Sequence, residues 1–61
     1  MKAREIIRIL EQDGWYFHSQ TGSHAQYKHP VKPGQVTVRM HGSKDLSKPD
    51  IHSILKQAGL K

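Results

Sequence analysis

The residues best suited to chemistry are polar side chains at alternate positions of three short segments. They bring together imidazole, amide, cationic and aromatic groups without a carboxylate: Tyr16, His18, His24, Gln26, Lys28, Thr37, Arg39 and His41. Alternate residues of a strand point to the same side of a sheet, so we expect these side chains on one open face. A cationic face that carries histidines and no acid suits a phosphodiester, whereas a plain solvated sheet surface is the alternative.

Such a face has the groups needed to cleave RNA. An imidazole with its ordinary pKa near 6.5 can accept a proton at neutral pH, and a neighbouring group can return one. The ribose 2′-hydroxyl is already next to its phosphorus, so a protein need only deprotonate it, neutralise the phosphate and protonate the leaving oxygen. This chemistry requires neither a metal ion nor a cofactor, and we expect none.

The composition argues against a metal site as well. The chain has no cysteine, and its Asp and Glu residues fall outside the expected face. A site made from His18, His24, His29 or His41 is the weaker alternative, because it lacks a carboxylate partner and a recognised ligand spacing.

Two helices are expected to support this face. Residues 3–13 place apolar side chains at helical spacing, and Gly14 suits the end of that helix. Ser47 suits an N-cap, with Pro49 in the first turn, and Gly59 ends the second helix.

Between the helices, alternation predicts strands at 15–18, 24–29 and 35–41, joined by turns at 19–23 and 30–34. The inward side chains are expected to be Trp15, Phe17, Ala25, Tyr27, Val36, Val38 and Met40. The fold class is therefore α+β, in the order α-β-β-β-α. One domain, residues 1–61, would hold a three-stranded antiparallel sheet with two helices on one face.

The register of the second and third strands decides which side chain faces His24. The alternation allows His24 opposite His41 or opposite Arg39, because the intermediate register would mix core and solvent faces. Either pairing places a second cationic or titratable group within cross-strand distance of His24.

Charge and length limit the function classes further. The chain of 61 residues carries a net charge of +5, which points to a polyanionic partner. A domain of this size encloses no deep substrate cavity, so its chemistry must act on something large. The absence of cysteine and of any apolar run near the ~20 residues of a membrane span favours the cytoplasm.

Several segments in order resemble the HicA toxins, or HicA mRNA interferases. The similarity covers nearly the whole chain and rests on these residues: Lys2-Ala3-Arg4-Glu5-Ile6-Ile7 with Leu10, Asp13-Gly14-Trp15, Gly22-Ser23-His24, Val36-Thr37-Val38, Met40-His41 and Ser53-Ile54-Leu55-Lys56-Gln57-Ala58-Gly59-Leu60. Gly-Ser-His alone is a weak tripeptide, and the order and spacing of the segments make the likeness specific.

The resemblance implies a fold like a double-stranded-RNA-binding domain and a ribonuclease toxin that cleaves mRNA, neutralised by a HicB-type antitoxin covering the active face. It also implies that His24 is catalytic. Around it we expect RNA contacts from Ser23, Lys28, Arg39 and His41, with His41 as the candidate acid for the leaving oxygen.

Two positions depart from the family pattern. Arg39 stands where proline is frequent, and Ser19 stands where arginine is common. Two interpretations stay open: Arg39 replaces the cation lost at Ser19, or the changes weaken activity. The alternative function is a non-catalytic RNA-binding module of the same fold, which binds RNA by shape and phosphate contact.

Overall fold

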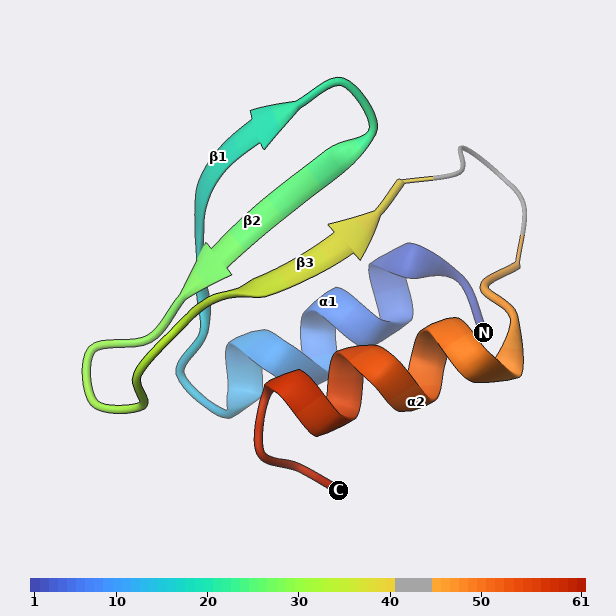
Figure 1. Ribbon diagram of the computed structural model, residues 1–61. Helices are drawn as coiled ribbons and strands as arrows, with labels where there is room; N and C mark the ends of the chain where they lie inside the picture. Colours follow the sequence, from blue (N-terminus) through green and yellow to red (C-terminus); the bar gives the residue numbers. More distant parts are fainter. Residues whose placement is uncertain (41–44) are drawn as a thin grey trace.

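The computed structural model describes residues 1–40 and 45–61 and confirms the expected order of elements (Figure 1). The described residues form two helices and a three-stranded antiparallel sheet with strand order β1-β2-β3. The bounds of these elements are α1 Ala3–Gln12, β1 Tyr16–Thr21, β2 His24–Lys28, β3 Val36–Arg39 and α2 Lys48–Gln57. The fold is therefore α-β-β-β-α, consistent with the topology of a double-stranded-RNA-binding domain.

The helices begin and end where local chemistry favours it. The Ser47 hydroxyl accepts a hydrogen bond from the Asp50 amide at 3.3 Å and so caps α2, with Pro49 in the first turn. The helix α1 ends at the cap residue Asp13, and Gly14 follows with φ +106°, a conformation that side chains rarely adopt. Neither helix of the described residues is long and apolar enough to cross a membrane.

One side of the sheet is covered and the other is open. In Figure 1 both α1 and α2 lie on the same side of the strands. Between these layers lies a core drawn from every element except β1: Ala3, Ile6, Leu10, Trp15, Ala25, Tyr27, Val36, Val38, Leu46, Ile54 and Ala58. The inward positions predicted for β2 and β3 are confirmed for Ala25, Tyr27, Val36 and Val38, whereas Met40 is only half-buried.

The strand β1 differs from the prediction in two ways. Phe17, expected in the core, is 53% exposed, although its ring still meets the Tyr27 ring edge-on at 5.9 Å between centroids. The helices pack against β3, and β1 forms the opposite edge of the sheet (Figure 1), so about half of the Phe17 side chain stays exposed.

The turn after β1 is also shorter than expected. The strand continues to Thr21, which pairs with His24, and only Gly22 and Ser23 lie between them. A shift in register between Phe17 and Ser19 inserts one residue into β1, which the simple alternation of the sequence does not reveal. Gly22 has φ +59°, the conformation that a two-residue hairpin turn needs at its first position.

The loop between β2 and β3 is tied to both helices. The Lys32 ammonium bonds the Asp13 carboxylate at 2.5 Å and the Ala58 carbonyl at 3.0 Å, so it joins the ends of α1 and α2. This hydrogen bond from Lys32 lowers the pKa of the Asp13 carboxyl below its ordinary value of 3.8. The far end of the sheet is thereby held against the helix layer.

His29 fastens the same loop from the other side. Its Nδ1 accepts the amides of Val31 and Lys32, each at 3.0 Å, so Nε2 carries the proton and donates to the Asp13 carbonyl at 2.7 Å. The ring also meets Trp15 edge-on at 5.1 Å. His29 therefore has a structural role. Both of its ring nitrogens are engaged, so it is not available as a ligand of the alternative histidine metal site.

Candidate functional site

His24 and Arg39 lie directly opposite each other on β2 and β3. This is one of the two registers that the alternation allowed. The Met40 amide donates to the Ser23 carbonyl at 2.6 Å, so Ser23 and Met40 form the hydrogen-bonded pair, and the adjacent pair His24–Arg39 is the non-hydrogen-bonded kind. Side chains of such pairs approach most closely, with Cα atoms about 4.5 Å apart. His24 and Arg39 are therefore cross-strand neighbours, and both residues are exposed.

The turn before His24 fixes the position of the His24 backbone. Gln20 donates from Nε2 to the Gly22 carbonyl at 3.0 Å, and the Ser23 carbonyl is held by Met40. A Cβ added at Gly22 would meet no atom within 4 Å, so the space beside the turn is open. A ligand backbone can therefore approach His24 closely from this side.

The remaining open-face residues extend along the strands away from His24. The Thr37 hydroxyl donates to Gln26 Oε1 at 2.7 Å, which ties the middle of β2 to β3. Lys28 pairs with Tyr16 at the far end of β2, four residues from His24, or about 13 Å along the strand. The structure thus brings Arg39 to His24 but leaves Lys28 apart, where it can meet a different phosphate of a long ligand. His41 lies outside the described residues.

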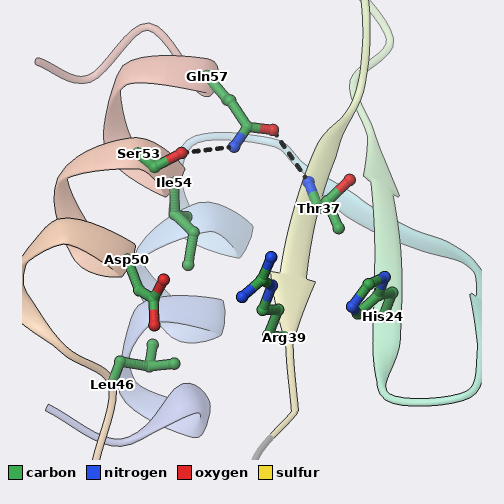
Figure 2. A pocket seen from close by; sticks show the side chains of 8 residues that line it. All are labelled: His24, Thr37, Arg39, Leu46, Asp50, Ser53, Ile54 and Gln57. Atoms are coloured by element: carbon green, nitrogen blue, oxygen red, sulfur yellow. Dashed lines mark hydrogen bonds between the residues drawn. The ribbon is translucent and has the colours of Figure 1, made fainter.

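A groove runs between β3 and α2 beside His24 (Figure 2). We call it the β3–α2 groove; its volume is about 210 Å³ and its lining residues are His24, Thr37, Arg39, Leu46, Asp50, Ser53, Ile54 and Gln57. Leu46 and Ile54 belong to the core and form the apolar part of the lining. The sequence predicts no carboxylate on the sheet face, and the carboxylate of this groove, Asp50, comes from α2 instead. The side chains of the sheet itself remain free of acid.

The wall of the groove that α2 supplies is held in place by hydrogen bonds. Gln57 Oε1 accepts the backbone amide of Thr37 at 3.2 Å, and Gln57 Nε2 donates to the Ser53 hydroxyl at 3.1 Å (Figure 2). The amide of Gln57 therefore has a defined orientation, and α2 is joined to the edge of β3. A wall positioned before a ligand arrives has less conformational freedom to lose on binding.

Three groups of the groove have no such partner. Within residues 1–40 and 45–61, no hydrogen bond or ion pair engages the side chains of His24, Arg39 or Asp50. Figure 2 shows the Arg39 guanidinium between Asp50 on α2 and His24 on β2. No cluster of three or more His, Asp or Glu side chains able to hold a metal ion occurs in this part of the chain.

The arrangement is suited to acid–base chemistry on a phosphate. A guanidinium can pair with two phosphate oxygens at once, and an exposed imidazole beside it can exchange protons with a group attached to that phosphate. The open face and the open space at Gly22 admit a polymer, which an enclosed pocket would exclude.

Sequence reasoning missed the α2 wall, although the sequence contains a signal for it. Asp50, Ser53 and Gln57 follow the spacing i, i+3, i+7, which places them on one stripe of a helix next to the apolar stripe of Ile54 and Ala58. The stripe is visible in the sequence, but the strand edge that it faces depends on how α2 packs.

Comparison with known protein families identifies one family model that matches the chain. The family described as HicA toxin of bacterial toxin-antitoxin matches residues 3–60. A comparison with individual curated proteins gives no match. Because the family match spans nearly all of the chain, the protein belongs to the HicA toxins of bacterial toxin–antitoxin systems.

Proposed function

We propose that this HicA toxin is an endoribonuclease that cleaves mRNA in the cytoplasm without a metal ion, with His24 as the general base. The observation that carries the proposal is the direct pairing of His24 with Arg39 on the open face of the sheet. The pairing supplies a proton acceptor and a fixed positive charge within the span of one phosphodiester.

In the proposed reaction, the neutral imidazole of His24 takes the proton from a ribose 2′-hydroxyl. The 2′-oxygen then attacks the adjacent phosphorus while Arg39 neutralises the charge that develops on the phosphate oxygens. Ser23 and the Gly22 amide lie at the turn before His24 and are candidate donors to the same oxygens.

The bond from phosphorus to the 5′-oxygen breaks as the new bond forms. The products are a 2′,3′-cyclic phosphate and a 5′-hydroxyl end, and the leaving oxygen must receive a proton. His41 stays the candidate donor from the sequence. Lys28, further along β2, would contact a neighbouring phosphate of the same RNA.

The test is cleavage of a defined RNA in excess EDTA, with analysis of both new ends. A second RNA with a 2′-deoxy residue at the cut site removes the nucleophile and should resist cleavage. Cleavage of the deoxy-substituted site, or complete inhibition by EDTA, would rule the mechanism out.

A non-catalytic RNA-binding module is the second candidate, and one observation favours it. No hydrogen bond from the described residues orients the His24 imidazole, whereas a catalytic base is commonly held by a third group. The same assay separates the two functions, since a binding module would retain RNA and leave it intact.

The toxin–antitoxin family also implies an antitoxin partner. We propose that a HicB-type antitoxin covers the His24 face with an acidic or aromatic surface. The charge of this face supports the proposal, because Lys28 and Arg39 project from the sheet without a neighbouring acid on the strands.

A further inference from the structure

We propose that the β3–α2 groove binds one unpaired guanine base of the RNA whose phosphate lies at His24 and Arg39. The inference rests on the proposed function, because it takes RNA as the ligand of this site. It adds a base-recognition subsite and assigns Asp50 as the residue that determines specificity.

The first reason is that the groove presents opposite charges on opposite walls. Arg39 belongs to β3 and Asp50 to α2, and within the described residues neither side chain forms an ion pair. A ligand that satisfies both must offer acceptors to the guanidinium and donors to the carboxylate. A nucleotide does so, since its phosphate accepts and the edge of its base donates.

The second reason is the shape and lining of the groove. Leu46 and Ile54 are almost fully buried and form the apolar floor of the groove, and polar side chains from the strands and from α2 form its walls. Its volume of about 210 Å³ is below the 300–1,000 Å³ typical of sites for drug-sized ligands, so it suits a single base. A base within a duplex is stacked and paired, so only an unpaired base could enter.

The third reason is the hydrogen-bonding pattern of the carboxylate. Asp50 offers two acceptor oxygens and no donor. Guanine presents two adjacent donors, N1–H and the N2 amino group, which match a carboxylate through paired hydrogen bonds. Adenine and cytosine present one amino group beside an acceptor, and uracil presents one N–H between two carbonyls, so each leaves a carboxylate oxygen unmatched.

The rigidity of the α2 wall makes this discrimination effective. Asp50 lies in the first turn of α2, where its own amide bonds to the Ser47 cap. The Gln57 bonds to Thr37 and Ser53 hold the same helix against β3. The carboxylate is therefore carried by a fixed backbone, and a mismatched base cannot be accommodated by moving the wall.

The test measures binding to short single-stranded oligouridine RNAs that carry one central guanosine, inosine or uridine. The protein carries His24→Ala, so that no RNA is consumed. Inosine lacks only the N2 amino group. Since a hydrogen bond to a charged group is lost, the guanosine RNA should bind roughly ten-fold or more tightly than the inosine RNA. A complementary strand over the central base should remove this preference.

The matched variants are Asp50→Asn and Glu11→Gln, each added to His24→Ala. Each removes one negative charge, but Glu11 lies exposed on α1 and does not line the groove. Asp50→Asn should bring the guanosine-to-inosine ratio close to one, whereas Glu11→Gln should leave it unchanged. Circular dichroism checks that each variant is folded. If Asp50→Asn does not fold, the proposal is judged by the guanosine-to-inosine binding ratio of the protein that retains Asp50.

Several results would overturn the proposal. These are a ratio near one with Asp50 present, an equal loss of preference in Glu11→Gln, a preference that survives in the duplex, and no binding to any of the RNAs. The ribonuclease proposal is tested separately, with His24 intact. Cleavage without a guanine preference removes only the groove proposal, and a preference without cleavage removes only the ribonuclease proposal.

Discussion

His24 lies at the start of β2, next to an open turn, and makes no hydrogen bond to the described residues. Its removal should therefore leave the fold intact while it abolishes general base catalysis. We expect His24→Ala to reduce the rate of RNA cleavage about 10²–10⁴-fold, as measured by gel-resolved single-turnover kinetics. The matched control is His52→Ala, which removes an exposed histidine from α2 outside the groove and should cleave normally. Equal loss in both variants would contradict the assignment of His24.

The cations of the open face contact different phosphates in the proposed complex, because Lys28 and Arg39 are well separated along the sheet. Each of Lys28→Ala and Arg39→Ala should weaken RNA binding and reduce the slope of log K against log salt by about one. The measurement is RNA binding at several salt concentrations. Lys56→Ala removes an exposed cation from the end of α2 and should keep the slope. An unchanged slope in both open-face variants would place the RNA elsewhere.

At the scale of elements, the junction of α1 and β1 depends on Gly14. Its φ is +106°, and an added Cβ would lie 2.6 Å from His29 Nε2, the atom that donates to the Asp13 carbonyl. Gly14→Ala should thus combine backbone strain with the loss of the His29 contact and lower the free energy of unfolding by roughly 2–3 kcal/mol or more.

The control for this prediction is Gly34→Ala. Gly34 also has a positive φ, +79°, but no atom lies within 4 Å of an added Cβ. This variant should show only the strain, about 1 kcal/mol. Urea denaturation measures both, and an equal loss would mean that His29 does not contribute at Gly14.

The Lys32 link between the helices should make stability depend on pH in acid. The pKa of Asp13 is lowered in the folded state by Lys32, so near the unfolded value of 3.8 the unfolded chain binds more protons. The stabilisation is therefore complete only well above pH 3.8 and is lost as pH falls through the folded pKa. Asp13→Asn should unfold more readily at neutral pH and lose less stability on acidification. Glu11→Gln leaves the ion pair between Asp13 and Lys32 intact and should keep the loss of stability in acid that this pair produces.

Much of the layered fold could be predicted because its core residues alternate without interruption. Ala25 and Tyr27 on β2 and Val36 and Val38 on β3 leave only two registers, and the structure has one of them. Phe17 was predicted wrongly for two physical reasons. An extra residue in β1 has no signature in composition, and burial at a sheet edge depends on how far the helices reach.

The site was predicted in part for a related reason. Arg39 lies opposite His24, which is one of the two registers predicted from the sequence. This pairing could be predicted because it follows from the alternation of apolar and polar residues along the two strands. The approach of Asp50 to the same groove depends on the packing of a helix distant in sequence, which local spacing does not determine. The strand pattern therefore predicts the β3 wall of the groove but not the α2 wall.

At the scale of the whole molecule, the proposed antitoxin should compete with RNA for the His24 face. Arg39→Glu places a negative charge opposite the acidic surface that we expect, and should weaken the complex with a HicB-type antitoxin at least about ten-fold. Lys56→Glu, on the exposed end of α2, should bind normally. The measurement is calorimetric titration, with hydrogen exchange to locate the protected strands. Protection confined to α1 and α2 would contradict a partner on this face.

The hydrogen bond from the Thr37 amide to Gln57 has a consequence for solubility. A strand at the border of a sheet exposes backbone donors and acceptors that can recruit a strand from another molecule. On β3 the side-chain amide of Gln57 takes the place of such a neighbour, so that border is partly blocked by the chain itself. On β1 the irregular register and the polar run Ser19-Gln20-Thr21 oppose pairing with a strand of another molecule instead. The two edge strands of the sheet are therefore protected against pairing with other molecules in different ways. Replacing Gln57 with leucine should promote aggregation through β3.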